Sequence, residues 1–200
     1  MSISPVKLVL GLGAISVTVG GGILVVKSMK DSSTVTVKDR LKKDGYFPLD
    51  VGKSDGWNEV LTAYNQKKDS PNLRFDHGNE QISEQRLKDI CEDLFKSDEK
   101  DSKYEKVKKW CVVPNSVSQV LLSKSFAVLD TTKTGDEDKT KWEALKTQYK
   151  DNDIPNFSFQ TNQDWKALRT KCKELVEKKP WDNDYEDSIT HAEKWCTDKG

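Results

Sequence analysis

The four cysteines are the residues whose type and spacing could do chemistry. Two distant segments each carry one cysteine inside an apolar stripe and a second that closes a Lys-Trp-Cys triplet. Cysteines so placed can form disulfides, bind a metal as thiolates, or stay as buried thiols. Because both segments keep both cysteines, we favour disulfides within each segment among the three possible connectivities. The predicted pairs are Cys91 with Cys111 and Cys172 with Cys196.

A zinc site is the sharper alternative, and the spacing argues against it. Structural zinc sites use four ligands at short spacings such as C-x2-C, whereas these cysteines are 20 and 24 residues apart. His77 and His191 are the only histidines, and they do not occupy matching positions. We therefore expect no metal site and no cofactor. Buried free thiols, which behave as small apolar side chains, stay open as a second alternative.

Other reaction motifs and a nucleic-acid surface are both missing from the sequence. The stretch GDEDKT at 135–140 lacks the second glycine of a phosphate-binding loop, and no H-E-x-x-H, G-x-S-x-G or Ca²⁺-loop pattern occurs. Residues 31–200 hold all 33 acidic residues and 30 (33 − 3) of the 33 basic ones, a net charge of about −3. We expect no catalytic residues, and nucleic-acid binding has no electrostatic support.

An internal repeat explains why the cysteine pattern occurs twice. Residues 36–50 align with 116–130, and the Trp, Leu, Tyr and Pro-Asn of 57–72 recur in 142–156. The cysteine-bearing segments then follow in the same order, and both copies end in Trp-Cys. The alignment predicts two tandem, related units, a repeat unit 1 at 36–113 and a repeat unit 2 at 114–200.

Each repeat is predicted to be helical. Trp57, Val60, Leu61 and Tyr64 follow the spacing of one helix face, and similar stripes surround the cysteines. We expect three or four helices per repeat with an extended link in the middle. Helix stops are expected at Gly45, Pro71 and Pro155. The predicted N-caps are Thr36 and Ser83, with capping boxes at Ser102–Glu105 and Ser116–Gln119.

The predicted helices also position the cysteines. In each pair, one cysteine lies inside the third helix and the other ends the last helix. A helical hairpin would place Cys91 and Cys111 roughly 9 and 15 Å from its turn, so a modest offset or tilt of the helices must bring their Cα atoms to the roughly 4.4–6.8 Å that a disulfide needs. The second pair is separated by 24 residues rather than 20, and we expect a longer loop to absorb the excess.

Recurring aromatic residues are expected to build the core of each repeat. Trp110 and Trp195 neighbour inward-facing cysteines, so we expect their rings to cover the edge of the core. The alternative is an aromatic contact surface for a partner. The predicted aromatic core consists of Trp57, Tyr64, Trp110, Trp142, Tyr149 and Trp195.

The N-terminal segment predicts a membrane anchor. Residues 8–26 contain no charge over 19 residues and lie between Lys7 and Lys27. As a helix this stretch would cover roughly 28 Å, close to the ~30 Å hydrocarbon core of a bilayer. A cleaved signal peptide would have a shorter apolar stretch and a small-x-small cleavage site. We therefore expect an N-terminal tail at 1–7, an uncleaved transmembrane anchor at 8–26 and a linker at 27–35. The lysines after the span favour the cytoplasm under the positive-inside rule, but long domains can translocate despite such charges, and we expect the bulk of the chain outside.

The fold class is thus mainly α: a single transmembrane helix followed by two small helical units. A Gly-rich span, repeated Trp…Tyr helices and a closing Cys…Trp-Cys resemble a paralogous family of uncharacterised membrane-anchored proteins of haemotropic mycoplasmas. The residues that carry this resemblance are Trp57, Tyr64, Cys91, Trp110 and Cys111 with their partners in the second copy. The resemblance implies a wall-less parasitic bacterium and an exposed protein that varies for immune evasion or contacts host cells. It implies no reaction, cofactor or catalytic residue.

We accordingly expect a non-enzymatic, surface-exposed binding protein or variable antigen on the cell membrane. Its expected partners are the membrane and a host-surface or extracellular protein, and its oligomeric state is left open. The alternative is a structural, self-associating membrane scaffold. An enzyme is the third and weakest alternative.

Overall fold

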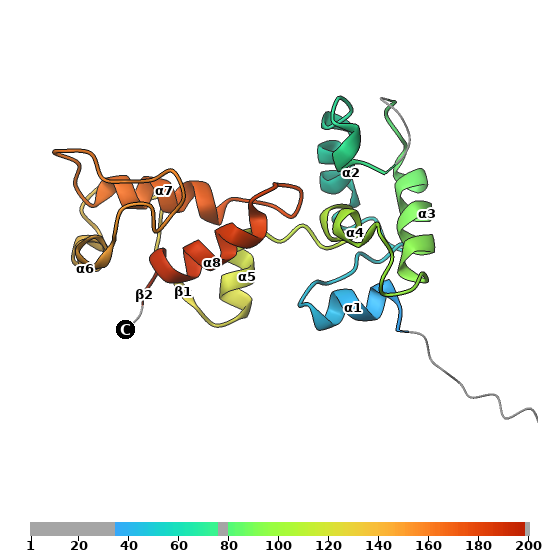
Figure 1. The fold of residues 1–200 in the computed structure, drawn as a ribbon, viewed down its shortest axis with the longest axis horizontal. Coiled ribbons are helices and arrows are strands. Elements are labelled where there is room, and N and C mark those ends of the chain that lie inside the picture. Colours follow the sequence, from blue (N-terminus) through green and yellow to red (C-terminus); the bar gives the residue numbers. More distant parts are fainter. Residues whose placement is uncertain (1–34, 76–79, 199–200) are drawn as a thin grey trace, which may run out of the picture. The chain divides into compact units, whose positions relative to one another are not determined.

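The described chain is mainly helical, and its helices gather in two groups that follow the sequence order (Figure 1). The computed structural model describes residues 35–75 and 80–198, which belong to one unit spanning Thr34–Gly200. Within those two ranges, no helix has the length and apolar character needed to cross a membrane. The predicted anchor at 8–26, the tail at 1–7 and most of the linker at 27–35 lie outside the described residues.

Among the described residues, each of the two predicted repeats contains four α-helices, within the predicted three or four. The first repeat holds α1 (Val37–Lys43), α2 (Trp57–Gln66), the short 3₁₀ helix η1 (Pro71–Leu73), α3 (Glu84–Phe95) and α4 (Tyr104–Trp110). The second repeat holds α5 (Val117–Ser123), β1 (Ala127–Val128), α6 (Lys139–Gln148), α7 (Lys166–Val176), α8 (Tyr185–Trp195) and β2 (Thr197–Asp198). The strands β1 and β2 pair antiparallel, with Val128 opposite Thr197.

Side-chain caps begin three of the helices, as predicted. The Thr36 hydroxyl accepts a hydrogen bond from the Asp39 amide at 3.2 Å, and the Asp39 carboxylate accepts one from the Thr36 amide at 3.1 Å. Ser116 and Gln119 form the same reciprocal box at the start of α5. Ser83 accepts from the amide of residue 86 and begins α3. These bonds satisfy amides that have no partner within the helix.

The predicted capping box at Ser102 and Glu105 is wrong. Helix α4 begins one residue later, with Lys103 at the N-cap and no side-chain cap bond. The preceding turn is instead organised by Asp98 and Asp101, whose carboxylates accept the amides of residues 100 and 103 at 2.9 and 2.8 Å. Such short aspartate turns compete locally with a serine cap.

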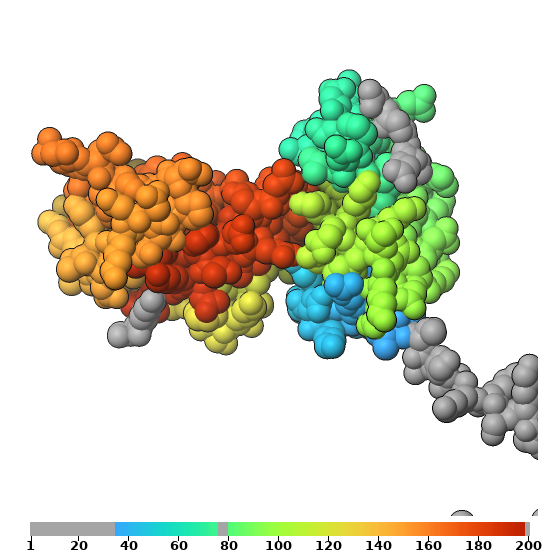
Figure 2. Space-filling view, in the orientation of Figure 1, coloured from blue at the N-terminus to red at the C-terminus, as the bar shows by residue number. Residues whose placement is uncertain are grey.

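Two hydrophobic cores lie within the two repeats. The first is built from residues of 37–112 and the second from residues of 117–196. In the second repeat, α7 and α5 both pack against α8, and the space-filling view shows α5 directly against α8 (Figure 2). The cores are small, so each depends on a few large buried side chains.

The two repeats make the same long-range backbone hydrogen bonds. One bond ties the first helix of each repeat to the turn after its third helix, and another ties the strand-like segment before the second helix to the closing cysteine. The bonded pairs are Val37 N to Ser97 O and Val117 N to Lys178 O, each 3.0 Å, and Leu49 N to Cys111 O and Leu129 N to Cys196 O, each 2.9 Å.

The clearest difference between the repeats is the length of the last helix. Helix α4 has 7 residues and α8 has 11. The distance along the chain from Cys91 to Tyr104 equals that from Cys172 to Tyr185, so the intervening loops are equally long. The expectation that a longer loop absorbs the four additional residues is therefore wrong. The excess forms one more helical turn, which lengthens α8 by about 6 Å.

Candidate functional site

Each repeat contains one disulfide that joins its third and fourth helices. Cys91 in α3 bonds to Cys111 at the end of α4, with the Cα atoms 5.5 Å apart. Cys172 in α7 bonds to Cys196 at the end of α8, also with 5.5 Å between the Cα atoms. This is the pairing within repeats that the sequence predicted. All four cysteines are 0% exposed, so the sulfur atoms are enclosed in the cores.

Disulfide formation leaves no free cysteine. The open alternatives of buried thiols and of thiolate ligands for zinc are therefore wrong for these four residues. Among residues 35–75 and 80–198, no group of three or more His, Cys, Asp or Glu side chains could hold a metal ion. His191 lies on α8, and His77 falls outside the described residues.

Aromatic side chains fill the space beside each disulfide. The rings of Tyr64 and Trp110 meet edge to face with centroids 5.1 Å apart, and those of Tyr149 and Trp195 do so at 4.9 Å. The Tyr149 hydroxyl accepts the amide of residue 154 at 3.0 Å and donates to the carbonyl of residue 157 at 2.8 Å. The Tyr64 hydroxyl likewise accepts the Phe75 amide at 3.1 Å. These tyrosines tie the link after the second helix to the core.

Trp110 and Trp195 are buried in the cores, as the predicted aromatic core requires, and lie deeper than rings that only cover the edge of a core. Trp110 is 0% exposed and Trp195 is 3% exposed, because each ring packs against the recurring tyrosine of its repeat and Trp181 also stacks on Trp110. Their burial also removes the alternative in which these rings form a contact surface for a partner. Trp57 and Trp142 are fully buried as well, whereas Tyr149 is partly exposed.

The indole N–H groups differ between the repeats. Trp57 donates to the Asp50 carbonyl at 2.9 Å, and Trp110 donates to the Leu73 carbonyl at 2.6 Å. The corresponding groups of Trp142 and Trp195 are buried and find no acceptor among the described residues. The second repeat therefore has two buried indole N–H groups without the hydrogen bonds that their counterparts make in the first repeat. This difference is unfavourable to the stability of the second repeat.

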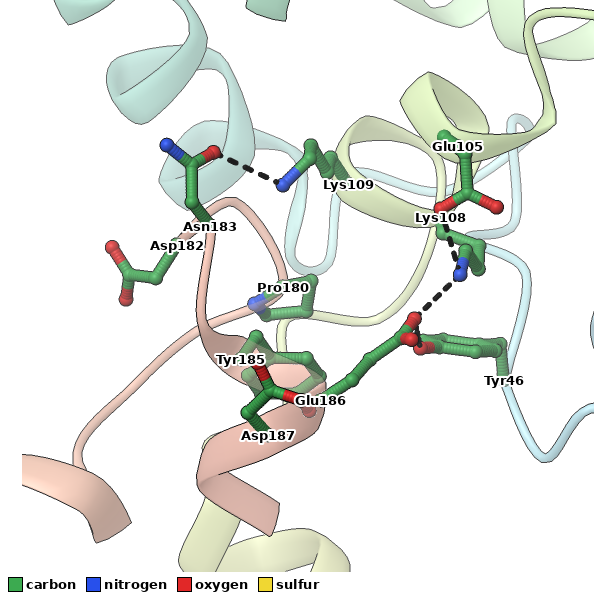
Figure 3. A pocket seen from close by; sticks show the side chains of 10 residues that line it. All are labelled: Tyr46, Glu105, Lys108, Lys109, Pro180, Asp182, Asn183, Tyr185, Glu186 and Asp187. Carbon is green, nitrogen blue, oxygen red and sulfur yellow. Dashed lines mark hydrogen bonds and ion pairs between the residues drawn. The ribbon is translucent and has the colours of Figure 1, made fainter. Parts of the chain in front are cut away.

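A polar cavity of about 160 Å³, lined by residues of both repeats, is a candidate binding site. The first repeat contributes Tyr46 and three residues of α4, and the second contributes the segment from Pro180 into the first turn of α8. Figure 3 shows Glu186 extending from α8 toward Lys108 and Tyr46, while Asn183 faces Lys109. The lining residues are Tyr46, Glu105, Lys108, Lys109, Pro180, Asp182, Asn183, Tyr185, Glu186 and Asp187.

Glu186 is the centre of the polar contacts in this cavity. Its carboxylate accepts a hydrogen bond from the Tyr46 hydroxyl at 2.7 Å and forms an ion pair with Lys108 at 2.5 Å. Lys108 also pairs with Glu105 at 2.9 Å. Partial burial acts to raise the pKa of Glu186, but the hydrogen bonds from Lys108 and Tyr46 outweigh it and hold that pKa below its ordinary value.

Two tyrosines and two lysines of the cavity also have shifted pKa values. Burial, followed by the hydrogen bond to Glu186, raises the pKa of Tyr46, and burial raises the pKa of Tyr185 to about 12. Burial acts to lower the pKa of Lys108, but its two carboxylate partners raise it overall. Burial lowers the pKa of Lys109, whose ammonium donates to Asn183 over a long 3.5 Å.

This arrangement is suited to binding through charge and hydrogen bonds. Its volume lies below the roughly 300–1,000 Å³ of typical small-molecule sites. A carboxylate with a lowered pKa and two tyrosines with raised pKa values lack the near-neutral pKa that favours general acid–base catalysis. The cavity also joins residues of the two repeats, so its polar groups have a structural use without any ligand.

Sequence reasoning missed the residues of this cavity. Tyr46 and Glu186 are 140 positions apart. They have counterparts in the other copy, Phe126 and Glu105, but the repeat gives no sign that Tyr46 and Glu186 meet. Two signals could have drawn attention to the region. The second copy has four additional residues before its closing cysteine, and Trp181 has no aromatic counterpart in the first copy, where Lys100 occupies the aligned position.

Comparison with known proteins adds no relative. No protein-family model, curated protein or solved structure matches this chain.

Proposed function

We propose that the chain is a non-enzymatic, single-pass membrane protein whose helical repeats are displayed outside the cell. There they bind host or extracellular material, or serve as a variable antigen. The observation that carries this proposal is the pair of buried disulfides between Cys91 and Cys111 and between Cys172 and Cys196. Disulfides form and persist in oxidising surroundings and are rare in the reducing cytosol.

The N-terminal sequence supports the membrane part of the proposal. An uncharged stretch at 8–26 has the length of a bilayer-spanning helix. The resemblance to membrane-anchored proteins of haemotropic mycoplasmas, carried by the Trp, Tyr and Cys pattern, adds the expectation of an exposed protein. The uncharged stretch and the resemblance are both arguments from the sequence, whereas the disulfides are observed in the fold.

The structure also suggests which positions would vary in an antigen. The disulfides and five of the six recurring aromatic residues are buried, so sequence change there would damage the core. The exposed faces of the helices and the polar loops have no such restriction. A binding or antigenic surface would therefore use these exposed positions and leave the core unchanged.

Protease treatment of intact cells tests the location. Cells expressing the full chain are incubated with trypsin, and the chain is followed by antibodies to the 34–200 region. We expect cleavage before lysis, while a cytoplasmic marker protein stays intact. Survival of the 34–200 region until the membrane is lysed would contradict display outside the cell.

Exposed apolar side chains favour self-association as a second candidate function. Phe47 is 61% exposed and Leu122 is 60% exposed, and Phe47 lines a shallow groove with Val113 and Val120. Large exposed apolar side chains can mark contact sites. Sedimentation of the full chain in micelles would test this. If the apparent mass rises with concentration, the Phe47→Ser and Leu122→Ser double variant should abolish that rise. A monomer at all concentrations would rule out the scaffold role.

A further inference from the structure

We infer that residues 179–186 form a docking segment through which the second repeat binds the first in one direction only. The segment runs from the turn after α7 into the first turn of α8. Its side chains contact the first repeat at an aromatic stack, an ion pair next to the chain between the repeats, and the Glu186 cluster of the polar cavity.

The aromatic stack is the apolar part of the docking. The ring of Trp181 lies nearly parallel to that of Trp110, with 7° between the planes and 6.2 Å between the centroids. Trp181 is only partly buried, yet it packs against the hydrophobic core of the first repeat. A tryptophan of the second repeat thus covers the tryptophan beside the disulfide of the first.

Ionic and hydrogen-bonded contacts surround the stack on both sides. Lys179 pairs with Glu59 of α2 at 2.9 Å and donates to the Pro114 carbonyl at 2.8 Å. At the other end of the segment, Glu186 contacts Tyr46 and Lys108. The two ends of the segment therefore engage different parts of the first repeat, which restricts rotation about the stack.

The additional turn of α8 explains why only the second repeat has this segment. Both loops before the last helix are equally long, but α8 begins one turn further from its closing cysteine than α4 does. The turn moves the loop by about 6 Å along the helix axis. Trp181 and Glu186 thereby project beyond the second core, toward the first repeat.

Aligned positions show that the docking has a direction. On the docking side, Lys179 and Trp181 align with Asp98 and Lys100 of the first repeat, so a negative charge replaces the positive one and the aromatic ring is missing. On the accepting side, the first repeat supplies a hydroxyl, a carboxylate and an ammonium, and the second repeat replaces each by a group that cannot make the contact. The replacements are Phe126 for Tyr46, Ala144 for Glu59 and Glu193 for Lys108.

Because of this asymmetry, the docking is complete within one chain. The accepting surface of the first repeat is occupied by its own second repeat, and the second repeat offers no equivalent surface. Copies of the chain would therefore not assemble head to tail through this segment. The contacts at both ends of the segment join the two repeats, so a surface that spans both of them can be presented to a partner.

A distance measurement in the full chain tests the docking. Thr62 and Thr147 occupy matching exposed positions on α2 and α6, and spin labels attached there through non-canonical amino acids leave the disulfides intact. We expect a single narrow distance in the unaltered chain. The combined Trp181→Ala and Glu186→Lys variant should broaden the distance distribution. Glu186→Lys alone should also broaden it, and adding Lys108→Glu to that single variant should narrow it again by restoring an ion pair.

Lys100→Ala is the matched control, because this exposed residue is the counterpart of Trp181 in the first repeat. It should leave the distance unchanged. Disulfide mapping and circular dichroism show that each variant keeps its fold. An unchanged narrow distance in the combined variant would overturn the inference. A broad distance distribution in the unaltered chain, or equal broadening of that distribution by Lys100→Ala, would also overturn the inference.

Discussion

Removing one disulfide at a time should measure how much each disulfide stabilises its small core. The informative variants replace both partners, Cys91→Ala with Cys111→Ala and Cys172→Ala with Cys196→Ala. Double replacement leaves no free thiol behind, and the pair in the other repeat stays as an internal reference. Because all four residues are 0% exposed, the lost sulfur atoms also leave small cavities.

The magnitude follows from the length of the loop that each bond closes. The separations are 20 and 24 residues, for which the chain-entropy model gives about 3.3 and 3.4 kcal/mol at 25 °C. With the cavities, each double variant should lose about 3–5 kcal/mol of unfolding free energy. The two losses should be nearly equal despite the additional turn of α8, because the closure entropy changes only logarithmically with loop length.

The assay is urea unfolding of the full chain in micelles, followed by tryptophan fluorescence. The buried rings of Trp110 and Trp195 pack on the tyrosine beside each bond, so unfolding of either repeat changes the fluorescence. A loss below about 1 kcal/mol, in a protein whose disulfides are shown to be intact, would refute the argument that the bonds stabilise the cores by constraining the unfolded chain.

Three further predictions test single contacts. In thermal unfolding, Trp57→Phe should lower the free energy of unfolding by about 1 kcal/mol more than Trp142→Phe does, because only Trp57 donates a hydrogen bond that the substitution removes. Equal losses would contradict the difference in indole hydrogen bonding. Ser116→Ala should destabilise the chain by about 1 kcal/mol by removing the cap of α5, and no loss of melting temperature would contradict the capping role. The pKa of Glu186 is lowered in the folded chain, so its stabilising contribution is present above its ordinary pKa and is lost as pH falls through the folded value. Glu186→Gln should accordingly be less stable than the unaltered chain at neutral pH and equal to it in acid; a stability difference that persists in acid would contradict this.

Local patterns predicted the helices and the disulfides because both depend on short-range spacing. The apolar stripe through Cys91 fixes which side of α3 faces inward, and the recurrence of the pattern at Cys172 gives the pairing. Ser116 with Gln119 marks a helix start that nothing nearby opposes. The similar pattern at Ser102 failed because Asp101 organises the turn before α4: its carboxylate accepts the amide of residue 103 and its carbonyl accepts that of residue 104. Capping patterns therefore predict a start only where no competing side chain lies close.

The contacts between repeats were beyond sequence reasoning for a different reason. Glu186 and Tyr46 meet only because the additional turn of α8 carries the loop toward the first repeat. Counting residues between cysteines showed the insertion but did not show whether the loop or the helix contained it. The burial of Trp110 likewise depends on the link after α2 and on Trp181, both distant in sequence.

Trapping the thiols of the protein in living cells tests the central claim most directly. Cells are alkylated before lysis, and the chain is digested without reduction and mapped by mass spectrometry. The account predicts peptides that join Cys91 to Cys111 and Cys172 to Cys196, with no alkylated cysteine. Alkylation of all four cysteines would show a reduced chain in a reducing compartment, and it would contradict both the sulfur-braced cores and display outside the cell.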